Sequence, residues 1–277
     1  MAATTLLGCD FSSAPNHRKP IVMALGSCSQ GRVQLTKLEE VQSLAAFEAW
    51  LRQPSHWVGA FDFPFSLPRE LVEHLGWPLV WPTLMAHYAS LSRADIRATF
   101  AAFCDARPVG GKFAHRATDR LAASSSSMKW VNPPVAYMLQ AGVPPLLGAG
   151  VHIPGLQEGD RTRVALEGYP GLLAREVLGN RSYKSDECVK QTAARLIARK
   201  DLIHALEMGQ TRLDLRLKLT HAQRDALVDD AKGDRLDAVL CLMQAAWAEA
   251  RHAGGASHYG LPPGFDALEG WIITTPD

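Results

Sequence analysis

The sequence predicts an α/β fold in which a mixed sheet, with three antiparallel strands followed by parallel strands, is flanked by helices. Three observations support this prediction. Residues 4–62 contain β-rich and helical runs in the order β-β-β-α-β. The run Trp57–Asp62 is almost entirely apolar, which is typical of a central parallel strand covered on both faces. Apolar residues at helical spacing then dominate the second half of the chain.

Three β-rich runs separated by turn residues open the chain, at residues 4–11, 21–25 and 32–38. The connections between them are of hairpin length, so these runs should form an antiparallel meander. A helix ending before Pro54 is predicted next, from apolar residues at nearly helical spacing, which are Leu38, Val41, Leu44, Phe47 and Leu51. Trp57–Asp62 then returns to the sheet as a parallel strand.

Residues 67–160 are mostly helical and irregular in pattern and are interpreted as an insertion. A strand ending on an acid is expected at residues 163–167, and Pro170 suits the first turn of a helix that continues to Leu178. The last strong helix should begin at Asp234, and residues 271–274 should add a closing strand.

Composition supports one domain over residues 1–277. A chain of 277 residues that is 47% hydrophobic and 21% charged is neither disordered nor fibrous, and no Gly/Ser or Pro-rich linker divides it. Its 29 basic and 28 acidic residues nearly cancel, which argues against a basic coat over the whole surface. A local basic patch remains compatible with this balance.

The cysteines and the apolar segments indicate a cytoplasmic protein. Five widely spaced cysteines form no C-x-x-C pair, so neither a disulfide framework nor a thiolate zinc site is expected. Asp10 interrupts the N-terminal segment before any long apolar run, so no secretory signal is expected. Residues 130–157 lack charge but contain five prolines, which argues against a membrane span and a membrane partner.

Acidic residues recur where predicted strands end. Asp10, Asp62 and Glu167 each follow an apolar strand, and Asp234 and Asp237 lie in the first turn of the last helix. Side chains at the carboxyl ends of neighbouring strands converge in open α/β sheets. Clustered carboxylates repel one another unless a cation holds them, and hard oxygen ligands suit Mg²⁺ or Mn²⁺. Two such cations roughly 3.5–4 Å apart would support phosphodiester hydrolysis.

Each acid also has a local structural explanation. Asp10 and Asp62 could begin Asx turns, Glu167 could favour a helix dipole, and Asp234 could be a helix N-cap. Asp237 differs, because small apolar residues follow it one and two turns later and place it beside a buried face, where it needs a partner. One shared metal site explains all five acids more economically than five separate turns.

Short motifs along the chain resemble those of the DUF429 family, predicted nucleases of the RNase H-like superfamily that includes the RuvC resolvases. The matching segments are residues 8–12 (GCDFS), 59–68 (GAFDFPFSLP), 116–120 (RATDR), 167–170 (EGYP), 183–184 (YK) and 234–238 (DRLDA). The resemblance implies an RNase H-like fold. It also implies catalysis by Asp10, Asp62, Glu167 and Asp237, with Asp234 joining these four as a metal ligand.

Basic residues point to the class of substrate. Residues 181–224 contain ten Lys or Arg against five Asp or Glu, so this segment could meet phosphates, although a solvated helical surface would have the same composition. The resemblance singles out Lys184 and Arg116 for substrate binding, and Ser12 joins them because its hydroxyl follows Asp10. The expected partner is a nucleic acid or a nucleotide.

Two other functions are compatible with the same residues. A phosphotransferase of the sugar-kinase/actin superfamily would also place an aspartate on the first strand, followed by hydroxyls such as those of Ser12 and Ser13. Those proteins duplicate the core, and no second β-β-β-α-β set occurs in this sequence. A non-catalytic RNase H-like interaction domain is the third alternative. The sequence therefore favours a metal-dependent nuclease.

Overall fold

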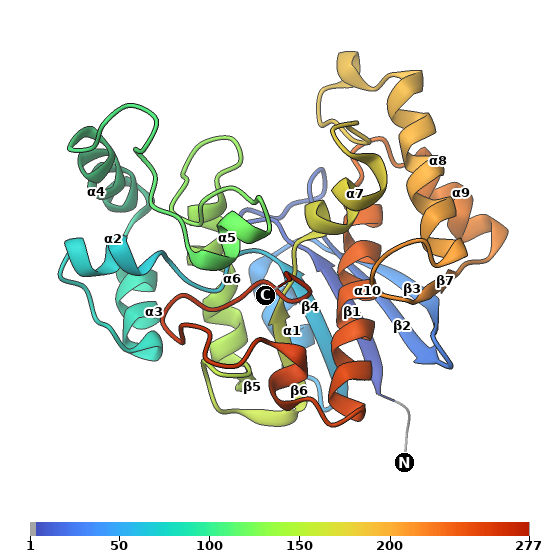
Figure 1. Ribbon diagram of the computed structural model, residues 1–277, viewed down its shortest axis with the longest axis horizontal. Helices are drawn as coiled ribbons and strands as arrows, with labels where there is room; N and C mark the ends of the chain where they lie inside the picture. The colour runs from blue at the N-terminus through green and yellow to red at the C-terminus, as the bar shows by residue number, and fades with distance from the viewer. Residues whose placement is uncertain (1–3, 277) are drawn as a thin grey trace.

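A mixed sheet forms the centre of the molecule. The computed structural model describes residues 4–276, and within them the strands of one seven-stranded sheet follow the order β5-β6-β4-β1-β2-β3-β7 (Figure 1). The strands are β1 (Thr5–Asp10), β2 (Ile21–Ser29), β3 (Arg32–Val41), β4 (Trp57–Asp62), β5 (Val151–His152), β6 (Asp160–Glu167) and β7 (Arg216–Lys218). β1, β2 and β3 are antiparallel, whereas β4, β6 and β5 extend the sheet in parallel from β1. The predicted mixed α/β sheet is confirmed.

The boundary between β3 and the first helix differs from the prediction. β3 continues to Val41, and α1 spans Leu44–Leu51, with the Ser43 side chain accepting a hydrogen bond from the Ala46 amide at 3.1 Å. The register between β2 and β3 shifts between Leu25 and Gly26. Because of this irregularity, Leu35 and Leu38 pack on the same core although they are three residues apart, a spacing that resembles a helix.

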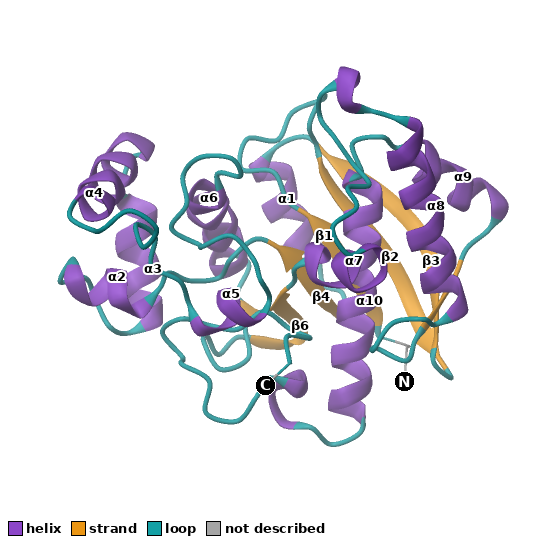
Figure 2. Cartoon of the chain, turned by 45° about the horizontal axis from the view of Figure 1, so that its top comes forward, coloured by secondary structure: helices purple, strands orange, loops and turns teal. Residues whose placement is uncertain are grey.

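Helices cover both faces of the sheet. They are α1 (Leu44–Leu51), α2 (Arg69–His74), α3 (Trp81–Ser90), α4 (Arg93–Asp105), α5 (Ala117–Leu121), α6 (Val135–Gly148), α7 (Pro170–Leu178), α8 (Ala193–Met208), α9 (His221–Asp229) and α10 (Asp234–Ala253), with short 3-10 turns at Cys188–Lys190 and Ser257–Gly260. The predicted starts of α7 and α10 are confirmed. α10 packs across β1, β2 and β4, and Figure 2 shows it with α7 in front of the sheet.

Two hydrophobic cores follow from the alternation of side chains along the strands. Leu6 of β1 and Val58 of β4 face α7–α10, whereas Leu7 and Phe61 face the opposite core, which contains α1. Residues of α2, α3, α4 and α6 belong to this second core. The segment predicted as a helical insertion therefore thickens one face of the sheet, and it also supplies the edge strand β5.

The C-terminal segment does not form the expected closing strand. Residues 271–274 make a single parallel bridge, between Ile272 and Glu167, where the amide of Ile273 donates to the carbonyl of Glu167 at 2.8 Å. The segment is held by side chains on either side, since the Ile272 amide donates to Thr118 at 3.0 Å and Gln244 donates to Thr274 at 2.8 Å. It thus joins α5 to α10 instead of extending the sheet.

In the part of the chain that the structure describes, no helix combines the length and the apolar character needed to cross a membrane.

Candidate functional site

Neighbouring parallel strands bring Asp10 and Asp62 together. Asp10 is the last residue of β1, Asp62 is the last residue of β4, and the two are direct partners in the register of these strands. Both strands are buried because their side chains face helices on each side, so their ends are fixed relative to one another. The two carboxyl groups therefore meet at the carboxyl edge of the sheet.

Two glycines allow α10 to bring Asp237 to the same edge. A Cβ at Gly8 would lie 2.0 Å from the Ala238 carbonyl oxygen and 2.2 Å from the Leu242 amide nitrogen, so only glycine permits this approach of β1 to α10. Gly233 precedes α10 with a φ of +78°, and a Cβ there would lie 2.8 Å from the side chain of Lys184. The start of α10 is thereby placed over the ends of β1 and β4.

The carboxylates of Asp10, Asp62 and Asp237 form one compact group. One oxygen from each can be chosen so that all three lie within 4.8 Å of one another. Asp237 is fully buried and Asp10 is 8% exposed. Burial, and next the charge of Asp237, raise the pKa of Asp62 to about 7, and the same two causes raise the pKa of Asp10 well above its ordinary value. Among residues 4–276, neither Asp10 nor Asp62 has a hydrogen-bond partner for its carboxylate.

Asp237 has the partners that its burial requires. The Tyr183 hydroxyl donates to one of its oxygens and the Lys184 ammonium donates to the other. Burial alone would lower the pKa of Lys184, but the negative charge of Asp237 and its neighbours raises it well above its ordinary value. Lys184 is therefore a charged ammonium group next to three carboxylates, and its side chain is still 42% exposed.

Asp234 lies beside this group and is held by a different lysine. Gly233, not Asp234, is the N-cap of α10, so the N-cap explanation for Asp234 is wrong. Its carboxylate accepts a hydrogen bond from Lys19 at 3.1 Å, and Lys19 also donates to Asp186 at 3.0 Å. The negative charge of Asp234 therefore compensates the positive charge of Lys19 at the border of the site.

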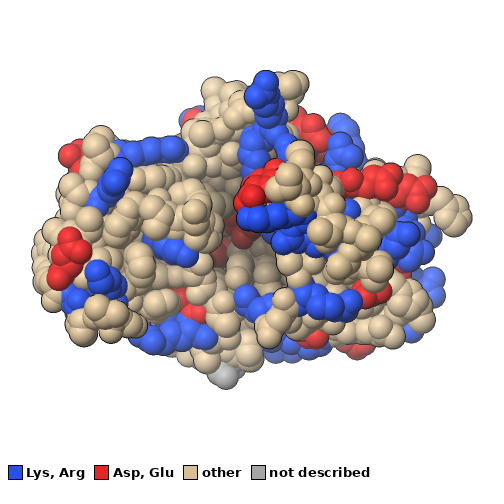
Figure 3. All heavy atoms as spheres, turned by 90° about the horizontal axis from the view of Figure 1, so that it is seen from above, with Lys and Arg blue, Asp and Glu red and all other residues tan. Residues whose placement is uncertain are grey.

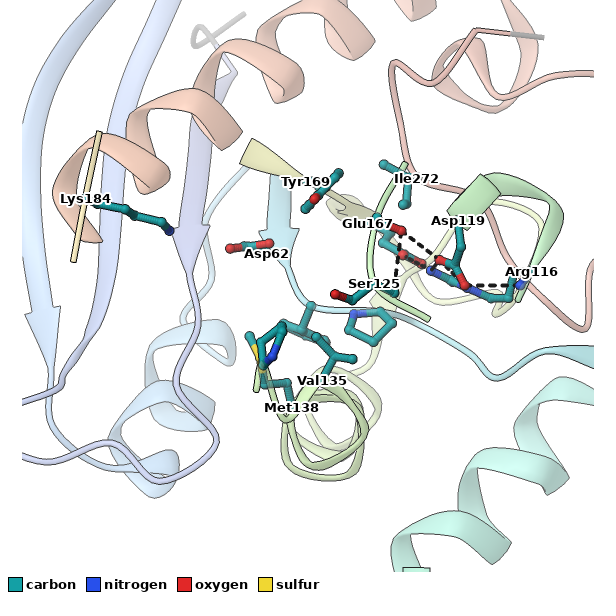
Figure 4. Close-up of a pocket in the computed structure, with 15 residues that line it drawn as sticks. Asp62, Arg116, Asp119, Ser125, Val135, Met138, Glu167, Tyr169, Lys184 and Ile272 are labelled. Atoms are coloured by element: carbon teal, nitrogen blue, oxygen red, sulfur yellow. Dashed lines mark hydrogen bonds and ion pairs between the residues drawn. The ribbon is translucent and has the colours of Figure 1, made fainter. Parts of the chain in front are cut away.

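Both carboxylate oxygens of Glu167 accept hydrogen bonds from a buried arginine. Arg116 donates from Nη2 to Glu167 Oε1 at 2.6 Å and from Nη1 to Oε2 at 2.8 Å, and the Phe65 amide also donates to Oε2 at 2.9 Å. Asp119 accepts from the same guanidinium at 2.8 Å, and both Arg116 and Asp119 are 1% exposed. Figure 4 shows this chain of ion pairs across the cavity from Lys184. The arrangement leaves Arg116 little freedom to reach a substrate.

Two cavities adjoin the three carboxylates. One, of about 300 Å³, is lined by Asp62, Lys184, Glu167 and the insertion. The other, of about 440 Å³, is lined by Asp10, Asp62, Ser12, Lys19 and Lys184. Figure 3 views this face of the molecule and shows a hollow with acidic side chains inside it and basic side chains along its border. Ser12 and Lys184 are thus placed where a phosphate could reach them.

Most other basic residues between positions 181 and 224 have structural partners. Arg181 pairs with Asp201 at 2.7 Å, Arg224 pairs with Glu207 at 3.1 Å, and Arg199 donates to the Val228 carbonyl at 2.7 Å. Much of the positive charge of this segment is therefore engaged by partners within the protein, and Lys184 is the member that joins the carboxylate group.

Sequence reasoning missed Lys19, and it gave no role to Asp119 or Tyr169 although they lie in the matched segments 116–120 and 167–170. Lys19 is an isolated lysine in a connection, where nothing in the sequence indicates its distant partner Asp234. Asp119 follows Arg116 at a spacing of one helical turn, which was a usable signal for an ion pair. Tyr169 lines the smaller cavity, and its sequence signals were the matched segment 167–170 and its place directly before the predicted helix.

Comparison with known proteins finds no family model, no curated protein and no solved structure that matches this chain.

Proposed function

We propose that the protein is a metal-dependent phosphodiester hydrolase, a nuclease, with an RNase H-like fold. The observation that carries this proposal is the convergence of Asp10, Asp62 and Asp237 from two strand ends and a helix start. The strand order, in which an antiparallel meander leads into parallel strands, supports the RNase H-like assignment. So do the positions of the acids on the first strand and on the last long helix.

The three carboxylates suit a divalent cation. Their oxygens are hard ligands, two of the groups have no hydrogen-bond partner among residues 4–276, and their mutual repulsion favours a bound positive charge. A bound Mg²⁺ or Mn²⁺ would supply an activated water and a Lewis acid for the phosphate. The geometry favours one cation, because Arg116 occupies both oxygens of Glu167 and Lys19 neutralises Asp234.

The remaining chemistry belongs to residues of the chain. Lys184 reaches the carboxylate group from a partly exposed position, so its ammonium can contact a phosphate oxygen as a point charge. The hydroxyl of Ser12, on the wall of the larger cavity, can donate to another phosphate oxygen. Tyr183 orients Asp237 through its hydroxyl. These groups bind and orient the phosphate beside the carboxylates.

A nuclease screen tests this function. Purified protein is incubated in Mn²⁺ or Mg²⁺ with single- and double-stranded DNA and RNA, together with the variants Asp10→Asn and Asp237→Asn. We expect cleavage by the wild type and its loss in both variants, because each variant removes an anionic ligand. Asp225→Asn is the control, because Asp225 is an exposed residue of α9. Equal cleavage by all four proteins would refute the assignment, and phosphoryl transfer from ATP without cleavage would favour the phosphotransferase.

A further inference from the structure

The smaller cavity lies directly beside the carboxylate group and differs from it in character. It has a volume of about 300 Å³, and it shares Asp62, Lys184, Pro133 and Met138 with the larger cavity. Its remaining walls come from the loop after β4, from α5 and the loop after it, from α6, from the end of β6 and the residues before α7, and from the C-terminal segment (Figure 4). A molecule bound beside Asp62 and Lys184 would therefore reach from the larger cavity into the smaller one.

The walls of this cavity are mainly apolar. Phe63, Val135, Met138 and Ile272 line it, and Ser125 adds a hydroxyl that can donate or accept a hydrogen bond. Small-molecule sites combine apolar walls with a few polar groups, and their volumes run from about 300 to 1,000 Å³. The cavity lies at the small end of this range. Its size therefore suits one small flat group and not a base pair.

The cavity also has an aromatic wall that is held in place. The guanidinium of Arg175 lies 5.3 Å from the centroid of the Tyr169 ring and donates to the Tyr169 hydroxyl at 3.2 Å. Arg175 is anchored in turn, because it donates to the carbonyl of Ala122. On Gly171, a Cβ would lie 2.8 Å from the ring, so the absence of a side chain there lets the ring lie close to the backbone. A ring fixed in this way loses little entropy on stacking.

The larger cavity is suited to the charged part of the same molecule. Lys19, Lys184 and Lys232 line it together with the hydroxyl groups of Ser12 and Ser13. A phosphate placed at Lys184 would lie at the point where the two cavities meet, beside Asp62. A flat apolar group attached to that phosphate through a sugar would then reach Tyr169. This combination of groups is that of a nucleotide.

We propose that the smaller cavity binds one nucleobase, stacked on Tyr169, so that the site acts on a nucleotide whose base is unpaired. The inference rests on the proposed phosphodiester hydrolase activity and adds its substrate class. An unpaired base is required because a base in a duplex is covered on both faces by its neighbours and on its edge by its partner. A free mononucleotide and a single strand both present such a base with the same chemistry.

Binding measurements test the pocket without cleavage. Adenosine and cytidine monophosphates are titrated by calorimetry in Ca²⁺, with ribose 5-phosphate as the ligand that lacks a base. We expect at least one nucleotide to bind about tenfold or more tightly than ribose 5-phosphate. Tyr169→Ala should weaken nucleotide binding about 5- to 150-fold, the range for one base stacked on an aromatic ring. Tyr169→Phe should retain binding, because it keeps the ring.

A substitution that fills the smaller cavity provides a second variant, in which Tyr169 is unchanged. Met138→Trp should remove the advantage of nucleotides over ribose 5-phosphate, because the indole would occupy the cavity. Met208→Trp is the matched control, since Met208 is 48% exposed at the end of α8. Melting curves verify that each variant folds. Equal binding of nucleotides and ribose 5-phosphate by the wild type, or unchanged nucleotide binding by a folded Met138→Trp protein, would overturn the pocket.

Oligonucleotides distinguish the two sources of the base and separate this inference from the proposed function. A single strand that competes better than a mononucleotide identifies a strand as the source, and the reverse identifies a free nucleotide. A blunt duplex should compete poorly. A duplex that competes as well as the single strand would contradict the proposal that the cavity binds an unpaired base. If no phosphodiester is cleaved in Mg²⁺ while nucleotide binding behaves as expected, only the hydrolase proposal fails.

Discussion

At the scale of single residues, the carboxylate group is a set of like charges held together by the fold. Asp10 and Asp62 receive no hydrogen bond within residues 4–276, and Lys184 is bonded to the third member, Asp237. The pKa values of Asp10 and Asp62 are raised, burial being the first cause and Asp237 the second. Protons and metal ions should therefore compete for these oxygens.

The proton on Asp62 should make metal affinity depend on pH. Its pKa is about 7 in the folded protein, against about 3.9 for an ordinary aspartate. As the pH rises from 6 to 8, Asp62 loses its proton and the affinity for Mn²⁺ should increase. Stability of the metal-free protein should change in the opposite sense, rising as the pH falls through 7 because only the folded state then takes up the proton. Titrations with Mn²⁺ and melting curves at pH 6 and pH 8 measure both effects.

The control for this pH dependence is Asp62→Asn. It removes the titrating group, so the melting temperature of the metal-free variant should vary less with pH than that of the wild type. An unchanged pH dependence in this variant would assign the effect to other residues.

Lys184 should act on phosphate without reading the bases. Lys184→Ala should weaken binding of all nucleic-acid sequences to a similar degree. It should also remove about one phosphate contact, which changes the slope of log affinity against log salt concentration by roughly 0.7 to 0.9. Binding isotherms at several salt concentrations measure this slope. Lys37→Ala is the control, since Lys37 pairs with Glu39 on β3 at 2.6 Å and has a 64% exposed side chain. An unchanged slope for Lys184→Ala would leave Lys184 as a structural partner of Asp237.

Arg116 should matter chiefly for stability. Arg116→Met would leave Glu167 and Asp119 buried without their shared cation, and breaking a buried pair in this way costs about 3–5 kcal/mol. Arg52→Met, which breaks the exposed pair with Glu48 on α1, should cost under about 1 kcal/mol. Urea unfolding of the three proteins measures the difference. Similar stabilities for the two variants would contradict the structural role assigned to Arg116.

At the scale of elements, the contact between β1 and α10 determines whether the site forms. Gly8→Ala would place a methyl group against the backbone of α10, since a Cβ there would lie 2.0 Å from the Ala238 carbonyl oxygen. We expect the free energy of unfolding to fall by about 1–3 kcal/mol, the usual range for overpacking. Metal affinity should fall too, because α10 must move away from Asp10. Urea unfolding and Mn²⁺ titration measure the two effects.

The matched control for this prediction is Gly111→Ala, in the loop after α4, where a Cβ would lie no closer than 3.9 Å to a neighbour. It should have a stability close to that of the wild type. Wild-type metal affinity in Gly8→Ala would show that the contact of β1 with α10 does not position the carboxylates.

The elements with strong local signals were predictable from the sequence. The meander, β4 and the starts of α7 and α10 follow from apolar patterning and turn residues. The end of β3 was misplaced because the irregularity near Leu25 breaks the period of two. β5 and β7 are only two and three residues long, too short for a pattern to indicate them. They exist because longer neighbouring strands offer them hydrogen bonds.

The site was predictable to the extent that it depends on strand ends. Asp10 and Asp62 follow apolar strands, and Asp237 lies beside a buried helix face, so their meeting follows from the topology of the sheet. The ion pair of Glu167 with Arg116 joins residues 51 positions apart, and the pair of Lys19 with Asp234 joins residues 215 positions apart. Such pairs depend on how loops are placed in three dimensions, which local patterns do not encode.

At the scale of the whole molecule, the C-terminal segment connects parts that lie far apart in sequence. Arg69 at the start of α2 pairs with Asp266 at 2.6 Å, and Glu269 accepts from the Ala117 amide at 3.0 Å. Further along the same segment, Thr274 accepts a hydrogen bond from Gln244 of α10. The insertion and α10 are therefore held in one arrangement on either side of the carboxylate group.

The pairing of β1 with α10 also sets when the site can form during synthesis. Asp10 and Asp62 leave the ribosome early, whereas Asp237 follows only after the insertion and α8 have been made. Until α10 docks against Gly8, a nascent chain has two of the three carboxylates and lacks the third. The candidate site therefore cannot be complete on a nascent chain before α10 has been made and has packed against β1.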